Sequence, residues 1–553
     1  MLSVEIHFLL SLLLQKRGNS FFLFFFLFDN MRRFLSRSTG RFVRQSSYAA
    51  GLFFYKVAGE EIFPYPSHKL DADESESLQG LIEQIRSNDK ELSLVGSRIA
   101  TEYGGLGLSH TAHALLCEEV GSTGERSLVS NIQHCGVCSY LISTVGSKEV
   151  KGKYLTSMSD GSVMMGWAVQ ENNGTDLSMT TSKVVSENGG YSLTGRKSCP
   201  FASNSTHFLV LAKTLTQTTT EEGPTESYRN SFFIVKRDSP GVKVENDSVT
   251  FEKTPVEDIV GVVGEGFGDA QVALFTEQYV YSATLLGYLK RVVQELRDTV
   301  PDKWATSVIA SCACTMYAME ASLYALTANL DLPTQDSLLE AALVNAFVQQ
   351  SADGWLSTLA TATPTSPQLE NCFRGAQEVV RLMEPVHFLH ATAACCGVED
   401  YGLVFQKTSL IQTVQQRTMR SAGMRDTIPI KEIDCTAIEK AIVRFGDAVE
   451  MTFTRYKSQV FYQSLLVSRL GEAASLIYAA SACASRAAMC ANKRLPTAKS
   501  EKQLATAFIA YAAERALTLC DECCNVGLTA DDSYKRIALQ VCEDAFVRSR
   551  KVE

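Results

Sequence analysis

The stretch from Gly166 to Lys197, GWAVQENNGTDLSMTTSKVVSENGGYSLTGRK, decides the fold of this chain. An apolar strand leads into Gly174-Thr175-Asp176, and Gly189-Gly190 predicts a hairpin that returns as a second strand. Because glycine has no Cβ, backbone N–H groups at such a turn can come close to a bulky ligand. Any glycine-rich hairpin offers the same access, so the turn alone does not identify the ligand.

Outside this stretch the chain alternates between two periodicities. Residues from about 70 to 160 repeat apolar side chains at helical spacing, and a 3.6-residue period returns after Gly268 and continues to the C-terminus. The region between them has short β-branched and aromatic runs, split by the polar stretch Thr214–Arg229, which we expect to be a loop. This order of helices, strands and helices predicts an α+β fold.

The composition is that of an ordinary globular protein, with 20% charged and 45% hydrophobic residues among 553. Two to four domains are expected at this length. A net charge of −9 argues against a general nucleic-acid binder. Cys135-Gly-Val-Cys138 and Cys520–Cys524 have metal-ligand spacing, but no histidine follows at a zinc-finger distance. We therefore expect reduced thiols and no metal site.

The first 50 residues read as a leader. Met1–Asn30 contains two apolar runs, and neither approaches the roughly 20 residues that a membrane-spanning helix needs. From Met31 onward the chain is rich in arginine and serine and has no acidic residue before Glu60. This pattern is typical of a mitochondrial presequence, and a basic disordered tail is the alternative.

Several motifs resemble those of the acyl-CoA dehydrogenase family. They are the strand pair described above, Thr101-Glu-Tyr-Gly-Gly-Leu-Gly-Leu108 and Val260-Gly-Val-Val-Gly-Glu-Gly-Phe267. The segment Lys457–Ala516 resembles the extra C-terminal domain of the subgroup that contains the very-long-chain acyl-CoA dehydrogenases and their complex I assembly paralogue. The resemblance implies an acyl-CoA dehydrogenase fold with an N-terminal helical domain, a central β-barrel domain, a helical bundle and an extra C-terminal helical domain.

The resemblance and the periodicity together divide the chain into six segments. The expected bounds are 1–50 for the leader and presequence, 51–160 for the N-terminal helical domain, 161–262 for the β domain, 263–397 for the helical bundle, 398–434 for a basic linker and 435–553 for the extra helical domain.

In this family FAD accepts a hydride from the β-carbon of an acyl-CoA while a carboxylate removes the α-proton, and a desolvated carboxylate is the stronger base. Arg381-Leu-Met-Glu384 matches the family motif through its glutamate, so the resemblance implies Glu384 as the catalytic base. A solvated glutamate at a helix end before Pro385 is the alternative. The resemblance also implies cofactor contacts from Trp167, Val169, Gly174 and Thr175, and a substrate contact from Thr175.

The chain departs from the family wording where the cofactor should bind. Val169-Gln170-Glu171 replaces Thr-Glu-Pro, and Cys199-Pro200-Phe201 replaces Trp-Ile-Ser. A glycine-rich turn is replaced by Thr361–Pro367, and the chain is shorter near Leu296–Pro301, where the family has Arg-x-Gln-Phe-Gly. On the substrate side, Gln278 or Tyr279 stands where an arginine is expected. Since glycine turns allow a phosphate to approach the backbone, these changes predict impaired FAD binding.

Two functions follow from the resemblance. The first is FAD-linked α,β-dehydrogenation of long-chain acyl-CoA in the mitochondrial matrix. The second is a non-catalytic structural or assembly subunit of a respiratory complex, complex I, as a homodimer or as a heterodimer with a family paralogue. The stretch Tyr401–Arg425 carries Lys407, Arg417, Arg420 and Arg425 and no acid, which predicts peripheral contact with the anionic inner membrane. A helix packed on its own domain, or a linker, is the alternative.

Overall fold

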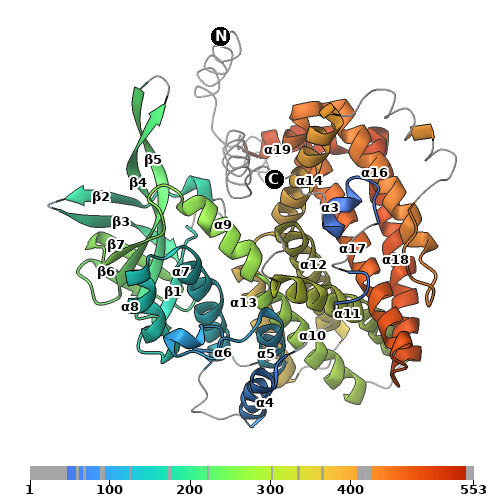
Figure 1. Ribbon diagram of the computed structural model, residues 1–553, viewed down its shortest axis with the longest axis horizontal. Coiled ribbons are helices and arrows are strands. Elements are labelled where there is room, and N and C mark those ends of the chain that lie inside the picture. The colour runs from blue at the N-terminus through green and yellow to red at the C-terminus, as the bar shows by residue number, and fades with distance from the viewer. Residues whose placement is uncertain are drawn as a thin grey trace, which may run out of the picture.

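The computed structural model describes residues 47–57, 62–66, 70–87, 94–124, 126–171, 177–187, 189–220, 223–299, 303–332, 337–362, 366–407, 417–418 and 426–542. In this part of the chain a β domain lies at one end of the molecule and a large helical body at the other, with short helices between them (Figure 1). The order of the parts is as predicted, with N-terminal helices, a β domain, a helical bundle and further C-terminal helices.

Along the chain, the described helices precede and follow the β region. Their bounds are α3 Tyr48–Leu52, α4 Ala72–Arg86, α5 His110–Thr123, α6 Arg126–Gln133, the π-helix η2 His134–Cys138, α7 Ser139–Val145, α8 Lys148–Ser159, α9 Gly266–Glu277, α10 Tyr279–Thr299, α11 Lys303–Leu330, α12 Leu338–Ala362, α13 Pro367–Leu382, α14 Val386–Lys407, α16 Thr436–Tyr456, α17 Ser464–Asn492, α18 Ala498–Cys524 and α19 Asp531–Cys542.

The described strands form one 8-stranded sheet in the order β6-β7-β3-β2-β4-β5-β8, with β1 paired to β4. Their bounds are β1 Met165–Ala168, β2 Lys183–Glu187, β3 Gly190–Ser198, β4 His207–Thr220, β5 Gly223–Lys236, β6 Val242–Glu245, β7 Ser248–Pro255 and β8 Asp258–Val260. The hairpin expected at Gly189-Gly190 is confirmed, because Glu187 pairs with Gly190 where β2 turns into β3.

The prediction of a loop at Thr214–Arg229 is wrong. Strands β4 and β5 continue through it, from the pair Thr214↔Arg229 to Thr220↔Gly223, and project from the sheet as a two-stranded ribbon (Figure 1). The stretch is polar but rich in threonine, whose branched side chain favours extended backbone. Hydrophilicity therefore excluded this segment from the core without excluding it from the sheet.

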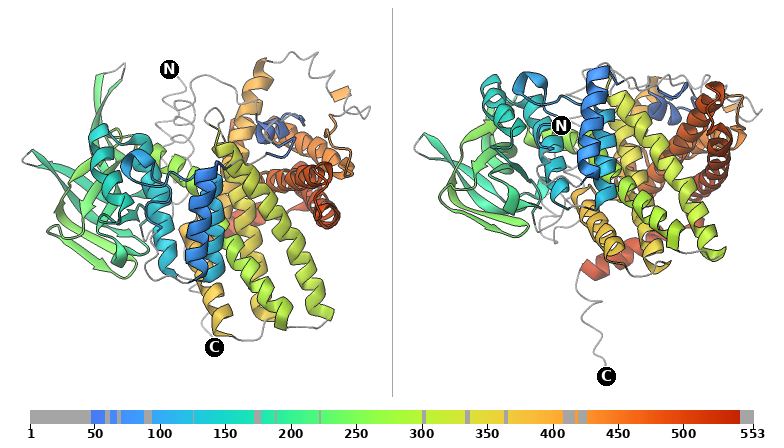
Figure 2. Two further views of the ribbon diagram at one scale, coloured as in Figure 1. Left: turned by 60° about the horizontal axis from the view of Figure 1, so that its bottom comes forward. Right: turned by 90° about the horizontal axis from the view of Figure 1, so that it is seen from below.

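The extra C-terminal helices pack against the helical bundle (Figure 2). Helices α17 and α18 contact each other and α11, and α17 also contacts α12 and α14. The short helix α3 is packed among them, with the Tyr48 hydroxyl 2.6 Å from Ser481 Oγ of α17. A single buried apolar cluster runs through these helices, so the added helices share one core with the bundle.

A partly buried ionic network crosses the seam between the bundle and the C-terminal helices. Lys290 of α10 lies 2.6 Å from both Glu118 of α5 and Glu320 of α11. Arg486 of α17 lies 2.7 Å from Glu320 and 3.3 Å from Glu501 of α18. Burial raises the pKa of Glu320, but Lys290 and Arg486 lower it more, so the pKa lies below its usual value. The network ties five helices together with alternating charges.

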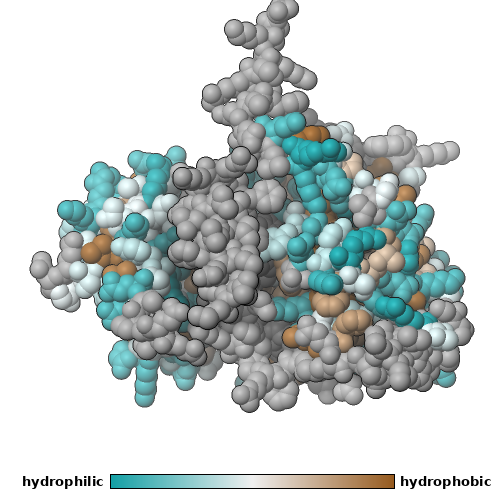
Figure 3. All heavy atoms as spheres, turned by 90° about the horizontal axis from the view of Figure 1, so that it is seen from above, coloured by the Kyte–Doolittle hydropathy of each residue, from teal (hydrophilic) through white to brown (hydrophobic). Residues whose placement is uncertain are grey.

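One described helical segment, Ser307–Leu330 of α11, is long and apolar enough to cross a membrane. Half of its most apolar stretch of 18 residues is buried inside the protein. Helix α11 also packs against α12 and α17, as a core helix does. On the face shown in Figure 3, the coloured apolar residues form small groups among hydrophilic ones.

The basic stretch around 398–434 is described only in part. Helix α14 continues to Lys407, so the predicted start of the linker falls inside a helix. Arg417 forms an ion pair with Glu450 of α16. Arg420 and Arg425 lie outside the described residues.

Candidate functional site

The first strand of the β domain places two of the predicted cofactor residues. Trp167 lies on β1 and is 6% exposed, with its ring 5.7 Å from that of Phe232. Val169 follows the strand and is fully buried. The other two predicted residues, Gly174 and Thr175, lie outside the described part of the chain. The structure therefore brings Trp167 and Val169 into one buried apolar cluster, together with residues of α7 and α9.

A buried ion pair beside Val169 links the segment that follows β1 to strand β3. Lys197 Nζ lies 2.9 Å from Glu171 Oε1 and donates to the carbonyl of Val169 at 3.1 Å. Both side chains are buried, with 0% and 6% of their surface exposed. Glu171 also accepts hydrogen bonds from the backbone N–H and hydroxyl groups of Thr181 and Ser182.

These contacts set the charges of the pair. Burial raises the pKa of Glu171, but Lys197 and the hydrogen bonds outweigh burial and bring the pKa to about 2. Burial lowers the pKa of Lys197 to about 8, although Glu171 opposes that shift. Both groups are therefore ionised at neutral pH.

The end of β3 offers no free backbone donor at three consecutive positions. The N–H of Ser198 donates to the carbonyl of Gln170 at 2.9 Å, and that of Cys199 donates to the carbonyl of Asp247 at 2.8 Å. Pro200 has no N–H. Phe201 has φ +63° and belongs to the buried cluster of the helical body.

The predicted base lies in the short connection between α13 and α14. Glu384 is 4% exposed, and its backbone N–H donates to Gln278 Oε1 at 3.1 Å. Gln278 follows α9 and is 2% exposed, and its Nε2 has no hydrogen-bond partner. The structure therefore joins Glu384 to one of the two positions that replace the family arginine.

The connection that carries Glu384 lies near the β domain. Phe388, one turn further on α14, stacks on Phe275 of α9 with ring centroids 6.2 Å apart. Phe388 also packs against the apolar cluster that contains Trp167 and Val169. Glu384 and the β1 residues thus flank one junction between the β domain and the helices.

A second buried carboxylate at this junction was not predicted from the sequence. Glu277 precedes Gln278, is 1% exposed, and neither of its carboxylate oxygens has a hydrogen-bond partner. Arg98 and His110 lie 3.8 and 3.6 Å from it. Burial raises the pKa of Glu277, but His110 and Arg98 lower it more, so Glu277 is an anion. An acid at the end of α9, directly after the run Val272–Thr276, was the available signal.

A histidine joins the π-helix to β1. His134 Nδ1 accepts the backbone N–H of Met165 at 2.9 Å, while Nε2 lies 3.1 Å from the carbonyl of Met158. Both contacts are satisfied by a neutral ring that carries its proton on Nε2. Burial lowers the pKa of His134 to about 4, which keeps the ring neutral.

No group of three or more His, Cys, Asp or Glu side chains placed to hold a metal ion occurs in the described ranges. Cys135 and Cys138 lie buried in η2, and Cys520, Cys523 and Cys524 lie buried at the end of α18. Burial raises the pKa of the Cys135 thiol to about 12, so this thiol is neutral.

The arrangement can bury a carboxylate beside an apolar wall, which suits proton abstraction in a dry site. The described residues offer few of the contacts that FAD would need. A flavin ring needs hydrogen-bond donors at its edge, whereas the described end of β3 uses the N–H groups of Ser198 and Cys199 internally and supplies none at Pro200. The carbonyl of Val169 is likewise occupied by Lys197.

Comparison with known families gives two matches. Residues 56–162 match the family model "Acyl-CoA dehydrogenase, N-terminal domain", and residues 432–547 match "ACAD9/ACADV, C-terminal domain". The second match covers the predicted extra helical domain.

Full-length relatives agree with these matches. The mitochondrial very long-chain specific acyl-CoA dehydrogenase of Rattus norvegicus is 26% identical over 85% of this chain and 83% of its own length, and that of Homo sapiens is 24% identical over 87% and 85%. An acyl-CoA dehydrogenase from Bacillus anthracis, solved in complex with FAD, superposes with a TM-score of 0.68 at 18% identity over 86% of each chain. The chain therefore belongs to the acyl-CoA dehydrogenase family, in the subgroup that carries the ACAD9/ACADV C-terminal domain.

Proposed function

We propose that this chain is a mitochondrial acyl-CoA dehydrogenase-family protein that holds FAD weakly and acts as a non-catalytic structural or assembly subunit of a respiratory complex. The observation that carries the proposal is the end of β3, where Ser198, Cys199 and Pro200 leave no N–H group for a ring ligand. The Glu171–Lys197 pair supports it, because Lys197 also occupies the carbonyl of the predicted cofactor residue Val169.

The size of the effect follows from the number of lost contacts. Each hydrogen bond or charged contact contributes roughly 0.5–3 kcal/mol. At about 1 kcal/mol each, four such losses weaken a nanomolar site, about −12 kcal/mol, to about micromolar. The four are the end of β3, the missing glycine turn at Thr361–Pro367, the absent Arg-x-Gln-Phe-Gly segment near Leu296–Pro301, and Pro385-Val386 after Glu384.

A restored donor tests the proposal. Pro200→Ile returns one N–H to the end of β3, and it should tighten FAD binding roughly five- to tenfold, the value of one hydrogen bond. The measurement is quenching of FAD fluorescence during titration with the purified chain. Pro240→Ile, at an exposed turn of the same domain, is the matched control and should leave affinity unchanged. Equal affinity for both variants would remove the end of β3 from the explanation.

An active long-chain acyl-CoA dehydrogenase is the second candidate, and the burial of Glu384 favours it. In that case the carboxylate of Glu384 accepts the α-proton. Glu384→Gln would then lower the rate by about 10²–10⁴, since the amide keeps the shape and cannot accept a proton. Glu277→Gln is the matched comparison, and a larger loss of rate in that variant would identify Glu277 of α9 as the base.

Location and partners are part of the proposal. The arginine-rich sequence after Met31 and the mitochondrial relatives support import into the matrix. A dimer, with itself or with a paralogue, and peripheral contact with the inner membrane are proposed for the same subunit. Fractionation of mitochondria followed by native electrophoresis would contradict the assembly role if the chain never migrates with a respiratory complex.

A further inference from the structure

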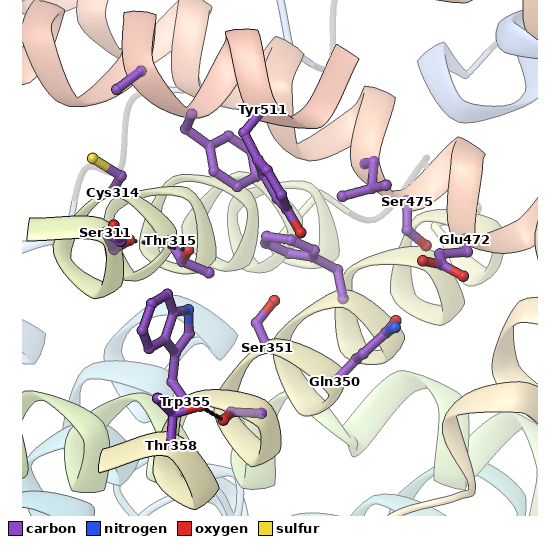
Figure 4. Close-up of a pocket in the computed structure, with 15 residues that line it drawn as sticks. Ser311, Cys314, Thr315, Gln350, Ser351, Trp355, Thr358, Glu472, Ser475 and Tyr511 are labelled. Carbon is purple, nitrogen blue, oxygen red and sulfur yellow. Dashed lines mark hydrogen bonds between the residues drawn. The ribbon is translucent and has the colours of Figure 1, made fainter. Parts of the chain in front are cut away.

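A cavity of about 750 Å³ lies in the seam between the bundle and the C-terminal helices. Its walls come from α11, α12, α17 and α18, far along the chain from the strand pair (Figure 4). The volume is in the range of cavities that hold small organic ligands, about 300–1,000 Å³. We propose that this cavity binds an uncharged, flat, amphipathic organic molecule.

Aromatic rings supply the apolar part of the cavity. Phe347 and Phe508 are buried and meet edge to face with centroids 5.7 Å apart. Trp355 points up from α12, while Tyr511 comes down from α18 on the opposite side (Figure 4). Tyr511 is 59% exposed, so a large aromatic side chain stays in contact with water at the opening. Rings on opposite walls favour a flat ligand that can stack between them.

One wall of the cavity carries a buried hydroxyl group. Ser475 of α17 lines the cavity and is 2% exposed, and its Oγ has no hydrogen-bond partner. A buried hydroxyl without a partner is costly, and a ligand with a hydrogen-bonding group would remove that cost. Gln350 and Ser351 add polar side chains from α12 (Figure 4). The occupant is therefore amphipathic rather than purely hydrocarbon.

The charges of the lining exclude an ionic occupant. Among the described residues that line the cavity, none is lysine, arginine or histidine, so nothing there neutralises an anion. The acidic member, Glu472, already lies 3.2 Å from Arg515, which neutralises it. The phosphates of nucleotides and of coenzyme A do not match this lining, so the inference is independent of flavin and acyl-CoA binding.

A glycine allows a clean test. Gly354 lines the cavity on α12, and a Cβ added there meets no atom within 4 Å. Gly354→Leu therefore adds an apolar side chain to the cavity at a position with room for its Cβ, and leucine also favours helix over glycine. Gly354→Ala is the matched control, since it makes the same change of helix propensity and leaves most of the cavity open.

The probe is Nile red, a neutral planar dye that fluoresces in apolar sites, titrated into the full chain. Saturable binding of one dye per chain is expected, weaker by at least about tenfold in Gly354→Leu and within about twofold in Gly354→Ala. An anilinonaphthalene sulfonate dye, planar but anionic, should bind at least about tenfold more weakly than Nile red. Ala507→Leu fills the same space from α18 and replaces Gly354→Leu if that variant loses its helical circular dichroism.

Undiminished Nile red binding in a folded cavity-filling variant would overturn the site. Equal binding of the anionic dye would overturn the class of ligand.

Discussion

The segment Met165–Ser198, which contains the strand pair β2–β3, and the helical seam both hold charged side chains inside the protein, but they do so in different ways. In the seam, Lys290 and Arg486 each contact two carboxylates, so five helices share the network. In the strand pair, Lys197 forms an ion pair with Glu171, and Lys197 also donates a hydrogen bond to the carbonyl of Val169. The ionic network of the seam is complete without a ligand, and the strand pair satisfies its buried charges internally. The difference supports the proposal that the fold is kept while the cofactor contacts are lost.

The strand pair should be the more fragile of the two. Lys197→Met leaves Glu171 as a buried charge without its lysine, and breaking such a pair typically costs about 3–5 kcal/mol. Urea unfolding monitored by circular dichroism measures the loss. The double variant Glu171→Leu/Lys197→Met removes both charges and should recover most of it. A single variant as stable as the parent would show that the pair does not hold the strands together.

The seam should lose less when one charge is removed. In Arg486→Met, Glu320 keeps Lys290 and Glu501 keeps the Tyr317 hydroxyl at 3.1 Å, so we expect about 1.5–3 kcal/mol, the value of a hydrogen bond to a charged group. Arg374→Gln, which breaks an exposed pair on α13, is the control and should cost under about 1 kcal/mol. If Arg486→Met is no worse than Arg374→Gln in the same unfolding experiment, the seam network is not stabilising.

Acid should weaken the junction in two steps. The pKa of His134 is lowered to about 4 in the native state, so between about pH 6.5 and 4 only the unfolded state binds this proton and stability falls as pH falls. The pKa of Glu171 is lowered to about 2, so its contribution is present above its usual pKa and is lost as pH falls from about 4.5 to 2. Unfolding midpoints across this range should slope less in His134→Gln above pH 4 and less in Glu171→Gln below it. Unchanged slopes in both variants would contradict these two assignments.

The elements of the fold could be predicted because their signals are local. Helical periodicity marks α10 to α12, and Gly189-Gly190 marks the β2–β3 turn. The ribbon at Thr214–Arg229 was predicted as a loop because polarity was given more weight than the strand preference of threonine.

Site contacts were harder to predict because they join distant segments. Gln278 and Glu384 are 106 residues apart, and no periodicity predicts that they meet. From the sequence, Glu171 could be interpreted only as the replacement of the family's proline. Its pairing with Lys197 depends on how the strands align.

The central claim is that the strand pair no longer holds a flavin firmly, and the FAD content of the purified full-length chain tests it most directly. The measurement is the visible absorbance spectrum of the native protein, with FAD released by denaturation and quantified against protein concentration. We expect a folded, nearly colourless protein with far less than one FAD per chain. One FAD per chain, with the two absorbance bands of a bound flavin, would contradict it and leave the active dehydrogenase as the function.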